Sequence, residues 1–121
     1  MLYSDVEQVL REAVPEFGPV IDEHIAFNDE LLPHVLFGDL TRFVLVAHDQ
    51  GNEELVRRCL VFLDEALREG DAMLENLVAV SFVENVEPWD PAMTRFIESW
   101  PAGLRQEAEE QRDWTPGDNA K

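Results

Sequence analysis

Residues 32–70 read LPHVLFGDLTRFVLVAHDQGNEELVRRCLVFLDEALREG. Apolar residues recur at helical spacing over residues 32–48, and a second apolar face lies between Asn52 and Gly70. The side chain of Asn52 can cap the start of a helix, and Gly70 is a good left-handed terminator. The stretch therefore predicts two long helices joined by a short polar turn.

Shorter helices are predicted on the N-terminal side of this pair. Ser4 and Glu7 have the spacing of a capping box, in which each side chain satisfies a free N–H group at a helix start. A helix is therefore expected over residues 5–13. Proline and glycine residues interrupt the next segment, and a second helix is expected over residues 19–29.

The C-terminal side predicts three further helices. Asp71 can cap a helix whose residues 73–83 are apolar nearly all round, which predicts a central position in the fold. Asp90 followed by a proline opens a short helix, and Pro101 opens another that fades near Asp113.

All these segments together predict an all-α protein. Short connections favour an irregular antiparallel bundle of about five to seven helices, or a compact stack of helical hairpins. Residues 42–47 are β-branched enough to suggest a strand, but no period-2 pattern supports one. We expect a single domain over residues 1–114 and a mobile tail over residues 115–121.

The charge of the chain excludes some partners. Twenty-six Asp and Glu residues face nine Lys and Arg residues, which gives a net charge of −17. Residues 1–40 hold nine acids against the single base Arg11, a local charge of −8. Nucleic acid and anionic membranes need a basic surface, so neither is expected to bind directly.

The sequence contains no recognisable site for catalysis, a metal or a cofactor. His24, His34 and His48 lie on separate segments without zinc-binding spacing, and no nucleophile motif surrounds Cys59. The lone cysteine fits a buried structural thiol. The chain also lacks a signal-peptide pattern and any long apolar run, which makes the cytoplasm the expected location.

Two segments carry polar residues inside apolar helical patterns. Gly38 interrupts the first, where close packing or a partner would require it, and Asp39 and Arg42 have the spacing of an ion pair. Ser81 and Asn85 lie four residues apart in the second. Asp39, Arg42, Ser81 and Asn85 are expected to form a buried polar network, with a ligand or partner site as the alternative.

The same two segments carry a resemblance to a known family. LLPHVLFGDL (residues 31–40) and NLVAVSFVEN (residues 76–85) resemble a bacterial family of small acidic helical domains, over residues 15–112. Some relatives are associated with polymorphic-toxin and contact-dependent inhibition loci, where small acidic proteins act as immunity proteins. The resemblance implies a helical fold and the neutralisation of a cognate toxin.

We therefore expect a protein-binding domain whose preferred specific role is an immunity protein for a basic bacterial toxin. A general adaptor and an enzyme are the alternatives. Opposite charge would speed capture of a basic partner. The candidate contacts are acids of the first two and the last helices and a tryptophan with its neighbour: Asp22, Glu23, Asp29, Glu30, Trp89, Asp90, Glu107, Glu109 and Glu110. Trp89, Trp100 and Trp114 can equally attach short helices to the core.

Overall fold

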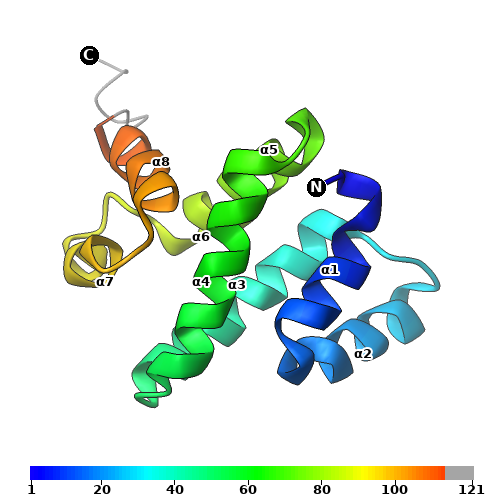
Figure 1. Cartoon of the computed structure of the whole chain (residues 1–121). Coiled ribbons are helices and arrows are strands. Elements are labelled where there is room, and N and C mark those ends of the chain that lie inside the picture. The colour runs from blue at the N-terminus through cyan, green and yellow to red at the C-terminus, as the bar shows by residue number, and fades with distance from the viewer. Residues whose placement is uncertain (114–121) are drawn as a thin grey trace.

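The computed structural model describes residues 1–113, and no strand occurs among them, which confirms the all-α prediction (Figure 1). The α-helices are α1 (Val6–Ala13), α2 (Gly18–Asn28), α3 (Pro33–Asp49), α4 (Glu53–Glu69), α5 (Ala72–Val78), α6 (Glu84–Val86), α7 (Thr94–Glu98) and α8 (Ala102–Asp113). Short 3₁₀ turns occupy Tyr3–Asp5, Pro15–Phe17 and Pro91–Met93, and a π-helical segment occupies Ala79–Val83. The predicted tail and Trp114 lie outside the described residues.

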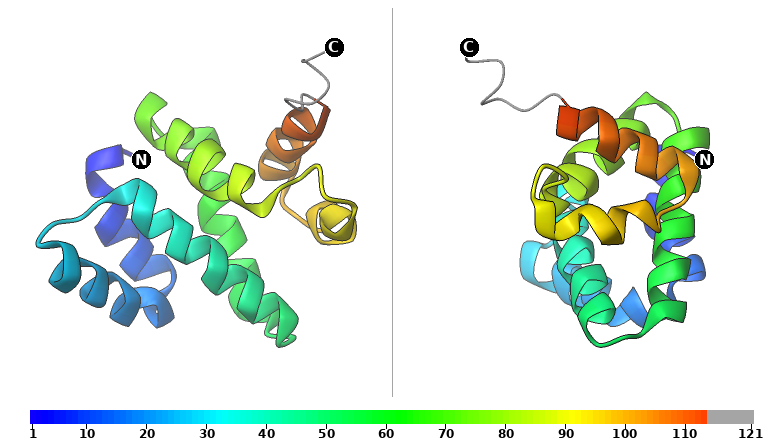
Figure 2. Two further views of the ribbon diagram at one scale, coloured as in Figure 1. Left: turned by 180° about the vertical axis from the view of Figure 1, so that it is seen from behind. Right: turned by 90° about the vertical axis from the view of Figure 1, so that its left-hand side faces the viewer.

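The predicted hairpin is present as α3 and α4. Gly51 takes a left-handed φ of 76° in the connecting turn, and the N–H of Asn52 bonds to the carbonyl of Ala47 at 2.9 Å. The side chain of Asn52 makes no capping hydrogen bond, so that expectation was wrong. Helix α4 runs through the middle of the molecule, with α1 and α2 on one side and α7 and α8 on the other (Figures 1 and 2).

The core is built mainly on α3, α4 and the α5–α6 segment. On α4, the side chains that face inward include Val56, Cys59, Leu60, Phe62, Leu63 and Ala66. Residues 73–83 are less uniformly buried than their sequence predicts, because Met73 and Val80 remain 61% and 41% exposed. Helix α5 therefore has one buried face and one exposed face, and the central position belongs to α4.

Asp71 caps α5 as predicted, and it also fixes the N-terminus of the chain. Its carboxylate accepts the N–H of Leu74 at 3.0 Å and the N–H of Tyr3 at 3.2 Å. The capping box predicted at Ser4 and Glu7 is wrong, because Ser4 lies in a 3₁₀ turn and no side chain caps α1. A long-range cap therefore replaces the local one.

Gly70 ends α4 in an extended conformation with φ −81° and ψ 164°, and the predicted left-handed terminator is wrong. A Cβ atom at this position would lie 2.3 Å from the carbonyl oxygen of Ala66 and 2.8 Å from Cδ2 of Leu74. The glycine is therefore required by close packing. Left-handed residues end two other helices, α2 at Asp29 with a φ of 62° and α6 at Glu87 with a φ of 63°.

The start of α8 is capped by a residue of α4. Asp64 is buried. Its Oδ1 accepts a hydrogen bond from the N–H of Leu104 at 2.9 Å, and its Oδ2 accepts one from Nε of Arg68 at 2.8 Å. A Cβ on Gly103 would lie 2.9 Å from the Asp64 carboxylate. Glycine thus allows α8 to approach α4 closely enough for this cap.

Candidate functional site

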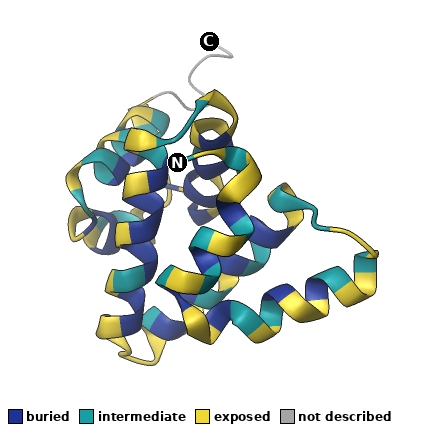
Figure 3. Cartoon of the chain, turned by 45° about the vertical axis from the view of Figure 1, so that its right-hand side comes forward, coloured by how far each residue is buried: buried dark blue, intermediate teal, exposed yellow. Residues whose placement is uncertain are grey.

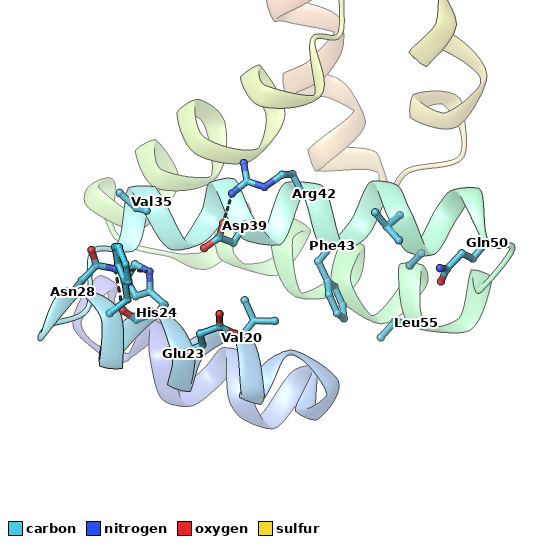
Figure 4. A pocket seen from close by; sticks show the side chains of 13 residues that line it. Val20, Glu23, His24, Asn28, Val35, Asp39, Arg42, Phe43, Gln50 and Leu55 are labelled. Carbon is cyan, nitrogen blue, oxygen red and sulfur yellow. Dashed lines mark hydrogen bonds and ion pairs between the residues drawn. The ribbon is translucent and has the colours of Figure 1, made fainter.

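An open groove of about 600 Å³ lies between α2 and α3 (Figure 4). Helix α2 projects from the body of the bundle and carries a row of exposed residues (Figure 3). Each wall is a stripe along one helical face, because the lining residues recur at intervals of three and four. They are Val20, Glu23, His24, Phe27 and Asn28 on α2, and Val35, Asp39, Arg42, Phe43, Val46 and Ala47 on α3, with Gln50 and Leu55 at the end.

The lining of the groove is largely apolar and accessible. Phe27 is 87% exposed, and Val35 and Val46 are 53% and 54% exposed. Phe43 is held by an edge-on contact with Phe17, whose ring centroid lies 5.1 Å away. In Figure 4, Phe43 and Val20 extend from opposite walls into the space between the helices. A contiguous exposed apolar surface of this kind is typical of an interaction site.

The edges of the groove are acidic. Asp39 forms an ion pair with Arg42, the cation that lines the groove. Glu23 is exposed and makes no ion pair within residues 1–113. Asp29 and Glu30 are exposed in the loop that follows α2. Glu23, Asp39 and Arg42 together leave the lining of the groove with a net negative charge, which favours a cationic partner.

His24 is hydrogen-bonded to the loop that connects α2 to α3. It is buried, and its Nε2 accepts the backbone N–H of Leu32 at 2.9 Å. Asn28 donates from Nδ2 to the carbonyl of His24 at 2.9 Å. The loop between α2 and α3 is thereby tied to α2, and the sequence contains no local pattern for a contact eight residues apart.

The residues of the predicted polar network form two local pairs. Arg42 bonds to Asp39 on α3, whereas Asn85 donates to the carbonyl of Ser81 at 2.8 Å. Asn85 and Arg42 both face the backbone of Gly38, since each has a side-chain nitrogen 4.0 Å from where a Cβ would stand. No hydrogen bond joins the two pairs within residues 1–113.

Two residues outside the expected network connect α3 to the π-helical segment. The hydroxyl of Thr41 donates to the Ser81 carbonyl at 3.1 Å, and Nδ1 of His34 lies 2.5 Å from the Ser81 hydroxyl. The Ser81 carbonyl thus has both a tertiary and a local donor, at the point where the helix adopts the wider π turn. Ser81 itself is 5% exposed, so its hydroxyl is closed to a substrate.

The predicted partner contacts lie on separate surfaces. Glu23 lines the groove, Asp22 forms an ion pair with Arg11 of α1 at 2.7 Å, and Asp29 and Glu30 lie in the loop that follows α2. Glu107, Glu109 and Glu110 lie on α8, at the other end of the molecule in both Figures 1 and 2. Trp89 is 39% exposed, and Asp90 caps the next turn through the N–H of Ala92 at 2.9 Å. Of these predicted contacts, only Glu23 lines the groove.

Sequence reasoning missed the apolar part of this site. Phe27, Val35 and Val46 sit in ordinary helical patterns, in which an exposed apolar residue looks like a core residue. The only available signal was the density of acids around Phe27.

The side chains with reactive potential are separated or buried. Cys59 is buried, and burial raises the pKa of its thiol to about 12, which keeps it protonated at neutral pH. Among the described residues, no three His, Cys, Asp or Glu side chains gather as metal ligands would.

Comparison with known proteins gives one match. A family model described as "Domain of unknown function (DUF7674)" matches residues 7–115. No curated protein and no solved structure matches the chain. Within the part of the chain that the structure describes, no helix is both long enough and apolar enough to cross a membrane.

Proposed function

We propose that this chain, which belongs to the DUF7674 family, is a protein-binding domain that neutralises a basic bacterial toxin. The observation that carries the proposal is the open apolar groove between α2 and α3, in which Phe27 is 87% exposed. Leaving a phenylalanine ring in water costs about 1.5–3 kcal/mol relative to burying it, and a partner that covers the ring recovers that free energy.

The charge of the protein supports a basic partner. A net charge of −17 destabilises the compact chain through self-repulsion, and acids border the groove. An opposite charge on the partner relieves this repulsion and accelerates association. The resemblance of residues 31–40 and 76–85 to a family of small acidic helical domains implies the same class of partner, because some relatives are associated with toxin loci.

Capture followed by a growth assay tests the proposed function. The tagged protein is used to capture partners from its native host at about 50 mM and about 500 mM salt, because screening weakens a charge-driven complex. We expect one stoichiometric basic protein, which arrests growth when expressed alone and no longer does so when this chain is co-expressed. Acidic partners, or a basic partner whose expression leaves growth unchanged, would contradict neutralisation and favour an adaptor.

A further inference from the structure

The shape of the groove identifies the kind of element that fits it. Both walls are helical stripes, and a helix packs into the furrow between two such stripes by interleaving its side chains with theirs. The described residues contain no strand whose edge could pair with an extended segment. The walls therefore suit a partner helix better than a strand.

The length of the groove sets the length of that helix. The α3 wall runs from Val35 to Gln50, which at about 1.5 Å per residue covers roughly 22 Å. A helix of about four turns spans this distance. It would cover Phe27, Val35 and Val46 together, which are the exposed apolar side chains of the two walls.

The charge of the groove decides between a second copy of this chain and a different partner. Two copies would bring together chains of net charge −17 each. Like charges placed together across an interface disfavour association. Lys or Arg residues beside the apolar face of an incoming helix would instead pair with Glu23.

We infer that the α2–α3 groove receives an amphipathic helix of the partner, with a row of large apolar side chains bordered by Lys and Arg. This inference rests on the proposed function, since it names the part of the basic partner that binds. Phe27 packs against the apolar row, and Glu23 pairs with a basic residue at its border.

Synthetic helices test the inference without the natural partner. The probe is a peptide of about 16 residues with Leu and Phe at helical spacing and Lys and Arg elsewhere. A second peptide keeps the apolar row and replaces Lys and Arg with Glu, and a third keeps the basic residues and replaces the apolar row with Ser. We expect only the first to bind, with amide NMR shifts concentrated in α2 and α3.

Matched variants of the protein complete the test. Phe27→Ser and Val46→Gln should each weaken binding of the first peptide by about tenfold, the loss typical of removing a central interface contact. Met73→Ser removes another exposed apolar residue, from α5, and should leave binding unchanged. Glu23→Lys should weaken binding of the basic peptide.

Several results would overturn the inference. These are equal binding of the basic and acidic peptides, equal binding of the peptide without apolar residues, no binding of any peptide, or equal losses from Phe27→Ser and Met73→Ser. The protein could capture and neutralise a toxin with an affinity that neither Phe27→Ser nor Val46→Gln changes. In that case the groove assignment fails while the proposed function stands. Peptide binding in the groove without toxin neutralisation would support the groove assignment and contradict the proposed function.

Discussion

The imidazole of His24 accepts the backbone N–H of Leu32 through Nε2 at 2.9 Å. Leu32 immediately precedes α3, so this bond joins the buried face of α2 to the start of the next helix. The bond requires Nε2 to be unprotonated, because a protonated nitrogen cannot accept. This bond thus contributes to the position of α2 relative to α3, and with it to the width of the groove.

Replacing this histidine should loosen the loop. His24→Ala leaves the Leu32 N–H without its acceptor, which costs about 1–2 kcal/mol of the free energy of unfolding. Hydrogen exchange should accelerate at the Leu32 amide and remain slow at the Leu36 amide, which bonds to the Leu32 carbonyl within the helix. Unchanged exchange at Leu32 would mean that His24 does not hold the loop.

The cap on α8 predicts a second effect on stability. Asp64→Ala removes the acceptor of the Leu104 N–H and should lower the free energy of unfolding by about 2 kcal/mol. Asp64→Asn keeps a side-chain oxygen and should cost less. Urea unfolding of both variants measures the difference, and equal losses would show that the negative charge matters more than the hydrogen bond.

Two glycines should respond in opposite directions to alanine. A Cβ on Gly38 would meet its nearest neighbours at 4.0 Å, so Gly38→Ala should stabilise the helix by about 0.5–1 kcal/mol. Gly70→Ala would place a Cβ 2.3 Å from a backbone oxygen and should destabilise the fold by about 1–3 kcal/mol. Thermal unfolding of the two variants compares them directly. A destabilised Gly38→Ala protein would contradict the space seen beside this residue.

The ion pair between Glu16 and Arg58 predicts a dependence on pH. Arg58 donates from Nη1 to Glu16 at 2.8 Å, and hydrogen bonding from this guanidinium is the main reason that the pKa of Glu16 falls from 4.5 to about 2. A lowered pKa in the folded state stabilises the fold above pH 4.5, and that contribution is lost as pH falls towards 2.

Glu16→Gln should therefore be less stable than the natural protein at neutral pH, and the gap should close between pH 4.5 and about 2. Urea midpoints measured across this range test the expectation. Glu98→Gln is the control, because Glu98 is exposed and makes no ion pair within residues 1–113. A constant gap for Glu16→Gln would contradict the ion pair.

The helices were largely predictable because their signals are local. Apolar spacing in residues 32–48 and 53–69 directly reflects the faces that the core buries, and Asp71 caps the segment that it precedes. The error at Ser4 has a tertiary cause, whereas the error at Gly70 arises from backbone and side-chain contacts within four residues of the glycine. Asp71 takes over the N-terminal contacts, and the carbonyl of Ala66 restricts the end of α4.

The candidate site was less predictable than the fold. The acids Asp22, Glu23, Asp29 and Glu30 were proposed as contacts from charge alone, and only Glu23 lines the groove. The groove itself depends on the angle between α2 and α3, which a contact eight residues apart helps to set. The helical pattern around Phe27 therefore predicts a core residue, although Phe27 is exposed in the fold.

The most direct measurement is of the affinity and the association rate of the captured basic partner. Both are measured with the natural protein, Phe27→Ser and Met73→Ser, at about 50 mM and about 500 mM salt. We expect a loss of about tenfold in affinity for Phe27→Ser, no loss for Met73→Ser, and slower association at the higher salt for all three. Equal affinities of the two variants, or association rates that do not change with salt concentration, would contradict an acidic apolar groove as the site that captures the partner.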